Sequence, residues 1–263
     1  MPHEAAAPPQ TWPVRSVWIL VGATVGVEIA YPLTGGELRD RLTVLTVLLF
    51  AAASVTHALL TRGPRTAALL VAVTAGGGLA VEAVGTATGV PFGAYTYADS
   101  LGPAVLGVPV VIPLAWTMMA WPAWLAARRL TASTPARIVV GAWALAAWDV
   151  FLDPQMVAAG HWRWADPVPG LPGVAGIPLT DYVAWLGVAL VMMTSLWLVD
   201  VHRGPSTDGS MTDAPMYGAY LWTYFSSVLA HAAFLGLPAS AAWGAVAMGP
   251  VAIPLAVRVG RHR

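Results

Sequence analysis

The chain contains no cysteine and no lysine, and charged residues make up only 10% of its 263 positions. Without cysteine it can form no disulfide, no thiolate nucleophile and no thiolate metal site. Soluble domains carry about 25% charged residues, whereas this chain is 57% hydrophobic. The composition therefore predicts a polytopic membrane protein in contact with membrane lipid. A net charge of zero and the lack of lysine argue against nucleic acid as a partner.

The chain divides into one long apolar region and two short flanks. Residues 1–13 lack a basic segment followed by an apolar core, so we expect a disordered tail and not a cleavable signal peptide. Residues 14–257 are predicted to form a single transmembrane helical domain. Residues 258–263 contain three arginines and are predicted to form a basic cytoplasmic tail.

Eight apolar runs have the length of a transmembrane helix. About 20 residues, at about 1.5 Å per residue, cross a hydrocarbon core of roughly 30 Å. The pattern predicts an all-α bundle of about eight transmembrane helices. The runs are 14–33, 42–60, 66–90, 103–127, 135–158, 177–201, 215–235 and 238–257.

The distribution of arginine predicts the orientation of the bundle. Eight spans place both termini on the same side of the membrane. Of the 13 basic residues, only Arg39, Arg41 and Arg163 fall on the opposite side. Because cytoplasmic loops carry the excess of positive charge, both termini are predicted to be cytoplasmic. The expected location is the cell membrane.

Five carboxylates interrupt the apolar runs: Glu28, Glu82, Asp149, Asp153 and Asp181. An acid at membrane depth costs about 2.5–3.5 kcal/mol on insertion scales. Such residues usually face a protein interior or a wet cavity and mark functional sites. The span boundaries place all five in the outer half of the membrane, so we expect them to contribute to one site.

Asp149 and Asp153 form a D-x-x-x-D pair on one helix face. Two close carboxyl groups in a low dielectric do not both ionise cheaply, so at least one is expected to keep its proton and to be able to donate it. A hydrogen-bonded packing pair is one alternative. A magnesium–diphosphate site, as in membrane prenyltransferases, is another, although a second acidic motif and basic residues for the diphosphate are missing.

The other acids have structural alternatives as well. Glu28 and Glu82 lie beside small-residue patterns (Gly22 and Gly26, Gly85 and Gly89) that allow helices to approach closely, so each could accept a hydrogen bond from a neighbouring helix. Asp181 follows GIPLT and could cap the start of its helix.

Tryptophan and tyrosine favour membrane interfaces, and most of them, Trp116 and Trp185 included, are expected to form such a belt. Five aromatic residues near the acids could instead hold a long apolar substrate or a developing cation. The histidines are dispersed without ligand spacing, so no metal site is expected. His231, near the outer end of its span, is a candidate binding residue. The five aromatic residues are Tyr95, Tyr97, Trp148, Trp162 and Trp164.

Three motifs in order resemble membrane-bound carotenoid biosynthesis proteins: PFGAYTYADSLGPAVLGVPVVIPLAWTMM, WDVFLDPQMVAAGHWRW and GIPLTDYVAW. They are similar to carotenoid hydratases of the bisanhydrobacterioruberin hydratase and gamma-carotene 1′-hydratase type. The resemblance covers roughly Glu82 to Trp197. One departure is Asp181, where the family is expected to favour asparagine.

The resemblance implies a cofactor-independent membrane enzyme that adds water to the terminal isopropylidene double bond of a linear carotene, giving a tertiary alcohol. Asp149 or Asp153 would supply the proton, and Glu82 or Glu28 would orient the water. The five aromatic residues, with Asp181 and His231, would contact the substrate. Other membrane enzymes of the carotenoid pathway are candidate partners. The competing interpretations are a prenyltransferase or carotenoid elongase, and a non-enzymatic carotenoid-binding or transport protein. A transporter would need acids that connect both sides of the membrane.

Overall fold

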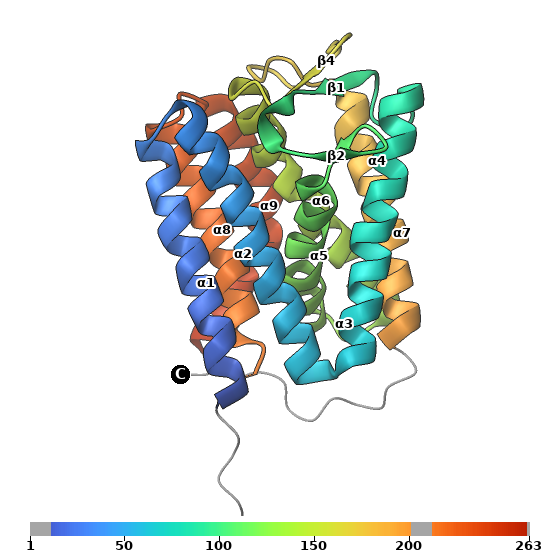
Figure 1. Cartoon of the computed structure of the whole chain (residues 1–263). Helices are drawn as coiled ribbons and strands as arrows, with labels where there is room; N and C mark the ends of the chain where they lie inside the picture. Colours follow the sequence, from blue (N-terminus) through green and yellow to red (C-terminus); the bar gives the residue numbers. More distant parts are fainter. Residues whose placement is uncertain (1–11, 201–211, 262–263) are drawn as a thin grey trace, which may run out of the picture.

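The computed structural model describes residues 12–200 and 212–261, and over these ranges the protein is a bundle of eight long helices (Figure 1). The predicted all-α membrane architecture is confirmed. Predictions for residues 1–11 and for the last two residues lie outside the described ranges. The helices are α1 (Trp12–Ala30), α2 (Gly36–Arg62), a continuous α3–η2–α4 helix (Pro64–Val71, Ala72–Gly76, Gly77–Thr88), α5 (Val111–Leu130), α6 (Thr134–Ala158), α7 (Leu179–Asp200), α8 (Ala214–Ala233) and α9 (Pro238–Gly260).

The first helix begins and the last helix ends at the same end of the bundle (Figure 1). The loops that contain β1 and β4 cover the opposite end. We call these the terminal end and the loop end. The start of α1 and the end of α9 therefore share one side, as an even number of spans requires. That this side is cytoplasmic stays a prediction.

Residues 103–110 differ from the prediction, which began the fourth span at Pro103. Helix α5 begins at Val111, and the preceding residues form a hairpin of β2 (Ala104–Val105) and β3 (Val108–Pro109). The turn residues Leu106 and Gly107 have positive φ angles of 53° and 79°. A two-residue hairpin turn of this kind requires positive φ at both central positions. The apolar run therefore begins before the helix does.

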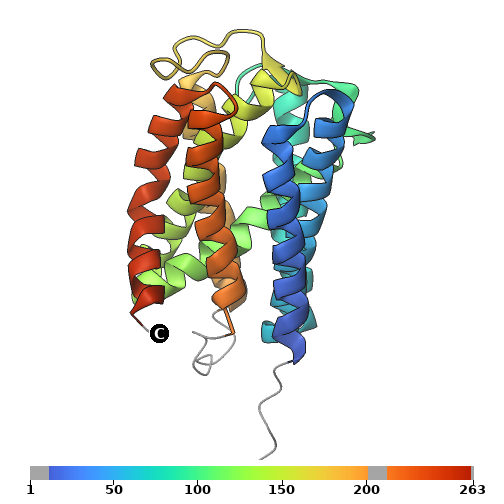
Figure 2. The same ribbon diagram turned by 90° about the vertical axis from the view of Figure 1, so that its left-hand side faces the viewer.

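Helix α5 crosses the bundle obliquely and packs in its interior (Figure 2). Every residue from Ala115 to Ala127 is buried. In the described ranges, six helices are long and apolar enough to cross a membrane by themselves, and α5 and α8 fall short. A helix surrounded by protein needs packing more than it needs lipid-facing hydrophobicity, which explains the tryptophans and prolines of α5.

Two prolines inside helices leave a carbonyl free, and a serine from another helix uses each one. Proline lacks the N–H that would bond the carbonyl four residues earlier. Pro122 thereby frees the carbonyl of Met118, which accepts from the Ser54 hydroxyl at 2.9 Å. Pro154 frees the carbonyl of Val150, which accepts from the Ser240 hydroxyl at 2.9 Å. These bonds join α5 to α2 and α6 to α9.

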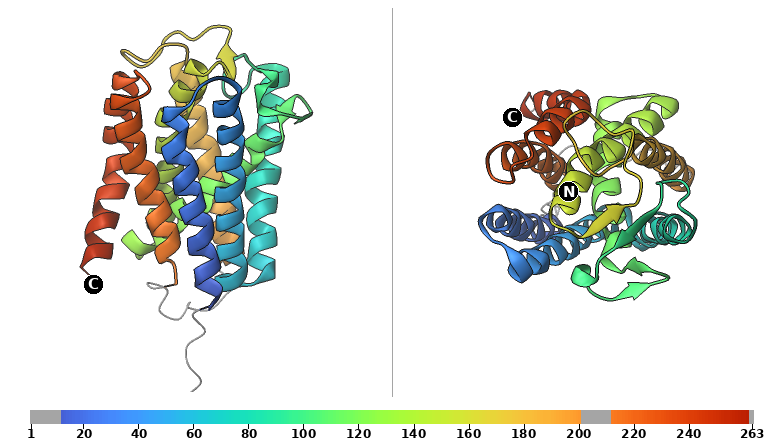
Figure 3. Two further views of the ribbon diagram at one scale, coloured as in Figure 1. Left: turned by 60° about the vertical axis from the view of Figure 1, so that its left-hand side comes forward. Right: turned by 90° about the horizontal axis from the view of Figure 1, so that it is seen from above.

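A two-stranded sheet lies across the loop end (Figure 3, right). Strand β1 (Tyr95–Tyr97) pairs antiparallel with β4 (Trp162–Trp164), and Tyr95 lies opposite Trp164. Side chains alternate between the two faces of a strand. Tyr95, Trp162 and Trp164 are buried, whereas Thr96 and Arg163 between them are exposed. The sheet therefore turns an aromatic face toward the helices.

Candidate functional site

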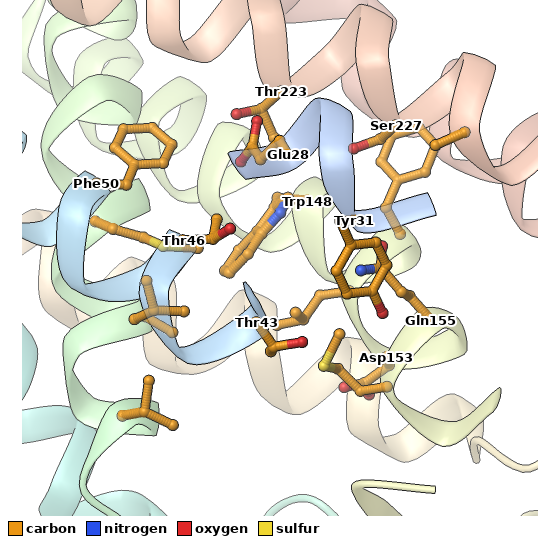
Figure 4. A pocket seen from close by; sticks show the side chains of 18 of the residues that line it. Glu28, Tyr31, Thr43, Thr46, Phe50, Trp148, Asp153, Gln155, Thr223 and Ser227 are labelled. Carbon is orange, nitrogen blue, oxygen red and sulfur yellow. The ribbon is translucent and has the colours of Figure 1, made fainter. Parts of the chain in front are cut away.

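A cavity of about 430 Å³ lies beneath this sheet, toward the loop end of the bundle (Figure 4). Its walls come mainly from α1, α2, α4, α5, α6, α7, α8 and the strands β1 and β4. Most of the predicted site residues, which lie far apart in the sequence, meet here. Those that line it are Glu28, Glu82, Asp153, Asp181, Tyr95, Tyr97, Trp148, Trp162 and Trp164. Asp149 and His231 are buried just behind the wall.

Asp149, Asp153 and Asp181 form a compact group, which we call the acid triad. One carboxylate oxygen from each lies within 4.8 Å of the others, and the side chains are at most 2% exposed. Within the described chain no donor reaches either oxygen of Asp149, or Oδ2 of Asp153 and of Asp181. Three charged carboxylates at this spacing would repel strongly in a low dielectric. A proton shared among them relieves that repulsion.

Asp181, for which the sequence left capping of its helix open as an alternative, belongs to this triad. It lies in the first turn of α7, and its side chain makes none of the capping hydrogen bonds found in the described ranges. It points instead to the two acids of α6. A carboxylate near a helix N-terminus is also favoured by the helix dipole, so both factors place the acid here.

Glu82 differs from the triad because donors surround it. Its Oε2 accepts hydrogen bonds from the hydroxyls of Tyr95 and Tyr97, and its Oε1 accepts from Trp116 Nε1 at 3.1 Å. Three donors aimed at one buried carboxylate stabilise its ionised form. Glu82 thereby fixes the positions of three aromatic rings at the cavity wall.

Small residues on α4 make room for those rings. A Cβ at Gly78 would lie 2.7 Å from Cδ1 of Trp116, and a Cβ at Gly85 would lie 2.9 Å from the Tyr95 hydroxyl. Gly85 was expected to allow close helix packing, but it accommodates an aromatic side chain of the loop. The π-helical turn at Ala72–Gly76 precedes these positions, and such turns often accompany functional sites.

Glu28 occupies a separate part of the cavity, beside Thr223 and away from Asp153 (Figure 4). Its Oε2 accepts a hydrogen bond from Trp222 Nε1 of α8 at 2.5 Å. The expectation of close helix packing at Gly22 and Gly26 is wrong, because nothing lies within 4 Å of a Cβ at either residue. The hydrogen bond between Glu28 and Trp222 therefore joins α1 to α8 at this end of the cavity.

Trp116 and Trp185, which were expected in the interface belt, belong to the cavity wall. Their rings stack with centroids 3.8 Å apart, and Trp148 meets Trp185 edge-on at 6.1 Å. The faces of tryptophan rings attract cations. Both residues are indistinguishable from interfacial tryptophan in the sequence, since only the arrangement of the helices brings them next to the acids.

Tyr31, Thr43, Gln155 and Trp222 also line the cavity, and the sequence did not point to them. They are single polar residues in apolar surroundings, without a motif. His231, a predicted binding residue, does not line the cavity but contacts two residues that do: its Nε2 lies 3.2 Å from the amide of Gln155, and its ring packs edge-on against Phe151 at 5.2 Å.

The cavity is open toward the lipid-facing surface between α1 and α8. Ile29 of α1, and Phe225 and Leu229 of α8, line it and are 52%, 55% and 61% exposed. Large apolar side chains with this exposure suit contact with acyl chains. A long apolar molecule can therefore extend from the cavity into the membrane without crossing a polar surface.

The triad has the spacing that a divalent cation could use. The residues that line the cavity include no arginine, and the chain has no lysine. A diphosphate held by such a cation would find no basic partner among the described lining residues. The walls instead match an uncharged, apolar ligand.

The fold and the site define a multi-pass membrane protein with an apolar, acid-lined cavity. The chain belongs to the family of carotenoid biosynthesis proteins, whose sequence model matches residues 42–251. It is 34% identical over 111 residues to the bisanhydrobacterioruberin hydratase of Haloarcula japonica. That match covers 40% of this chain and 36% of the relative, so the chain matches little more than a third of the relative's length. No solved structure matches the chain. The resemblance carried by the three motifs is confirmed.

Proposed function

We propose that the protein is a carotenoid hydratase that adds water to the terminal isopropylidene double bond of a linear carotene. The observation that carries this proposal is the acid triad, which lies at the wall of an aromatic cavity and has four buried oxygens that no donor of the described chain reaches. Acid-catalysed hydration needs a protonated carboxyl group in an apolar site. The family supports a carotenoid as the substrate, and the hydratase relative supports addition of water as the reaction.

The reaction begins with transfer of a proton from Asp153, which is the triad member on α6 that faces the cavity. The proton bonds to the less substituted alkene carbon, and the π electrons form that bond. The other alkene carbon becomes a tertiary cation. Asp149 and Asp181 lie next to Asp153. The negative charge that the transfer leaves on Asp153 can therefore be shared with them through a proton that remains within the triad.

Aromatic faces then stabilise the cation until water attacks it. Trp148, Trp162 and Trp185 line the cavity beside the acids, and cation–π attraction at a desolvated site is worth about 2 kcal/mol. The oxygen of water forms a bond to the cation, and the resulting oxonium returns a proton to the carboxylate of Asp153. One water is added, no electron is gained or lost, and no cofactor is required.

The substrate reaches the acids from the membrane. The opening between α1 and α8 admits one end group, while the rest of the polyene stays among the acyl chains. This entry requires a membrane location, for which the cell membrane is proposed. Glu82 acts by holding Tyr95, Tyr97 and Trp116 in place, and Glu28 lies near the entrance.

Two other functions are less well supported by the site. A prenyltransferase or elongase needs basic residues for a diphosphate, and none lines the cavity in the described ranges. A transporter needs polar groups that connect both sides of the membrane. The triad, Glu82 and Glu28 all line or adjoin one cavity at the loop end, and Asp213 at the terminal end is paired with Arg62 and does not line that cavity. A non-enzymatic binding protein would have no use for protonated acids at the ligand.

The test is expression in a host that accumulates an acyclic carotene, followed by mass spectrometry of its pigments. Hydration adds the mass of one water for each modified end. A gain of five carbons would support the prenyltransferase. An unchanged pigment, with the protein present in the membrane, would contradict an enzymatic role.

A further inference from the structure

We infer that Gln155 holds the water molecule that attacks the cation, and that His231 fixes the orientation of its amide. This inference rests on the proposed hydration and assigns a role to residues that the acid chemistry does not use. It follows from a chain of hydrogen bonds that begins at Pro154 and ends in the cavity.

The first step is the carbonyl that Pro154 leaves free. Because Pro154 has no N–H, the carbonyl of Val150 has no partner within α6. The hydroxyl of Ser240 on α9 donates to it at 2.9 Å. A serine hydroxyl carries one hydrogen, so Ser240 has only its lone pairs left for other partners.

The second step fixes the tautomer of His231. Its Nδ1 lies 2.9 Å from Ser240 Oγ, and the side chain is fully buried. Because Ser240 acts as the acceptor in this contact, Nδ1 carries the hydrogen. A doubly protonated ring would be a buried charge, and no carboxylate contacts His231 in the described ranges, so that form is costly. Nε2 is therefore an acceptor.

The third step orients Gln155. His231 Nε2 lies 3.2 Å from the terminal amide of Gln155, at the atom placed as Oε1. The two ends of an amide have the same shape and are assigned from their partners. An acceptor nitrogen requires the NH₂ group on this side. The carbonyl oxygen of Gln155 consequently faces the cavity, where it can accept a hydrogen bond from water.

Other polar groups complete a water-sized site. With the amide turned this way, the Tyr31 hydroxyl can donate to the Gln155 carbonyl, which keeps a second lone pair for water. Figure 4 shows Tyr31, Thr43 and Gln155 grouped on the same side of the cavity as Asp153. The Thr43 hydroxyl donates to the carbonyl of Arg39, so its oxygen is an acceptor. A buried water needs two to four polar partners, and this group supplies them beside the proposed acid.

The consequence concerns the fate of the cation. A water held by the Gln155 carbonyl directs its oxygen at the cation and its second hydrogen at Asp153. Without that water the cation still forms but loses a proton again and returns to an alkene. Gln155 is therefore required for capture and not for protonation, and the two steps can be measured separately.

The experiment incubates membranes with the acyclic carotene in D₂O and measures two products. One is the alcohol, and the other is carbon-bound deuterium in the recovered carotene, which reports protonation followed by loss of a proton. We expect Gln155→Leu to lower alcohol formation about 10²-fold, the size of a misplaced reacting group. Deuterium exchange into the recovered carotene should continue, so the ratio of exchange to hydration rises.

His231→Phe and Ser240→Ala should shift the same ratio by about tenfold, because they loosen the amide without removing it. Ser195→Ala is the matched control for Ser240: its hydroxyl bonds to the Val191 carbonyl of its own helix, outside the cavity. This control should leave the ratio unchanged. Elution of each variant as a single species in detergent excludes loss of folding as the cause.

Two results would overturn the inference. One is a Gln155→Leu protein that is folded and hydrates at the wild-type rate. The other is a folded variant in which exchange and hydration fall together, which would place Gln155 in protonation or substrate seating. A wild-type protein that gives neither alcohol nor deuterium would instead contradict the proposed function itself.

Discussion

The bundle contains buried carboxylates at both ends, and Asp213 at the terminal end differs from the acid triad at the loop end in its partners. At the terminal end, Asp213 accepts two hydrogen bonds from Arg62 at 2.9 and 3.0 Å, and lies 3.5 Å from Nε2 of His57. At the loop end, the acid triad has no basic residue against it in the described ranges. Asp213 is a structural acid that is held charged. In the proposed mechanism, the triad keeps a proton available for transfer.

The comparison shows that burial alone does not identify a reactive acid. Burial raises the pKa of Asp213, and the Arg62 guanidinium opposes that increase. His57, which lies beside Asp213, has partners on both ring nitrogens. Its Nδ1 accepts from Trp121 Nε1 at 2.9 Å, and its Nε2 lies 2.9 Å from the Thr212 carbonyl. What separates Asp213 from the acid triad is the supply of donors. This difference can be tested residue by residue.

The largest effect is expected at Asp153. Asp153→Asn removes the proton donor but keeps the size of the side chain and relieves repulsion within the triad. We expect alcohol formation to fall about 10³-fold, or about 4 kcal/mol of activation free energy, without loss of thermal stability. Pigment analysis and a melting curve in detergent measure the two quantities. Unchanged hydration would remove Asp153 from the mechanism.

Asp213→Asn should have the opposite profile. It leaves the largely buried Arg62 guanidinium, whose side chain is 11% exposed, without its carboxylate, and breaking such a pair costs about 3 kcal/mol of unfolding free energy. Activity per folded molecule should be unchanged, because Asp213 lies at the other end of the bundle. Glu37→Gln is the matched control: it breaks an ion pair with Arg41 whose side chains are 79% and 73% exposed, and should have no measurable effect. Equal losses in both variants would contradict this assignment.

Glu82 sharpens the comparison, because it is an acid of the loop end that resembles Asp213 in having donors. Glu82→Gln leaves one carbonyl oxygen for three donors, so we expect a loss of about 2 kcal/mol in stability. Alcohol formation should fall no more than about tenfold through looser aromatic rings. A loss as large as that of Asp153→Asn, in a stable protein, would place Glu82 among the proton-transferring residues.

A smaller effect, on stability, is expected from Gly78→Ala, because Gly78 makes room for the Trp116 ring that bonds Glu82. Trp116 is 1% exposed and stacked on Trp185, so it cannot yield to a Cβ at 2.7 Å. Overpacking costs about 1–3 kcal/mol of unfolding free energy. The helix preference of alanine partly offsets this cost, so we expect a net loss of about 1 kcal/mol, measured by a melting curve in detergent. Gly77→Ala is the matched control, since its nearest atom would be Met192 Cε at 3.9 Å. A destabilised Gly77→Ala would refute the steric explanation.

Removal of divalent cations is expected to have no effect on hydration. The triad could accommodate a cation by its geometry, but the proposed chemistry requires protons on these carboxyl groups. Treatment of membranes with a chelator should leave the rate of alcohol formation unchanged. A loss of activity that magnesium restores would contradict the contrast between the triad and Asp213, because a metal ion and not protons would then neutralise the triad.

The number of helices and the position of most of the acids were predictable from the sequence. Hydropathy locates membrane-length runs, and the even number of runs places Glu28, Glu82 and Asp153 toward one end. The same reasoning failed at Pro103, where apolar residues form a hairpin. Hydropathy measures affinity for an apolar environment and carries no information on where a helix begins.

The partners of the acids could not be predicted from the sequence. The three donors of Glu82 come from β1 and α5, and Trp222, which bonds Glu28, lies 194 positions away. For Asp181, a predicted substrate-binding residue, capping of its helix stayed open as an alternative because a local explanation was available. Only the packing of α7 against α6 shows that it faces Asp149 and Asp153.

The most direct test of the central claim is hydration in D₂O by the wild-type protein and by Asp153→Asn. A carboxyl proton that exchanges with solvent delivers one carbon-bound deuterium to each hydrated end, and the hydroxyl oxygen comes from water. We predict an alcohol with one such deuterium per modified end from the wild type, and neither alcohol nor carbon-bound deuterium from the folded variant. An alcohol without carbon-bound deuterium, or an equal amount of labelled alcohol from Asp153→Asn, would contradict the account.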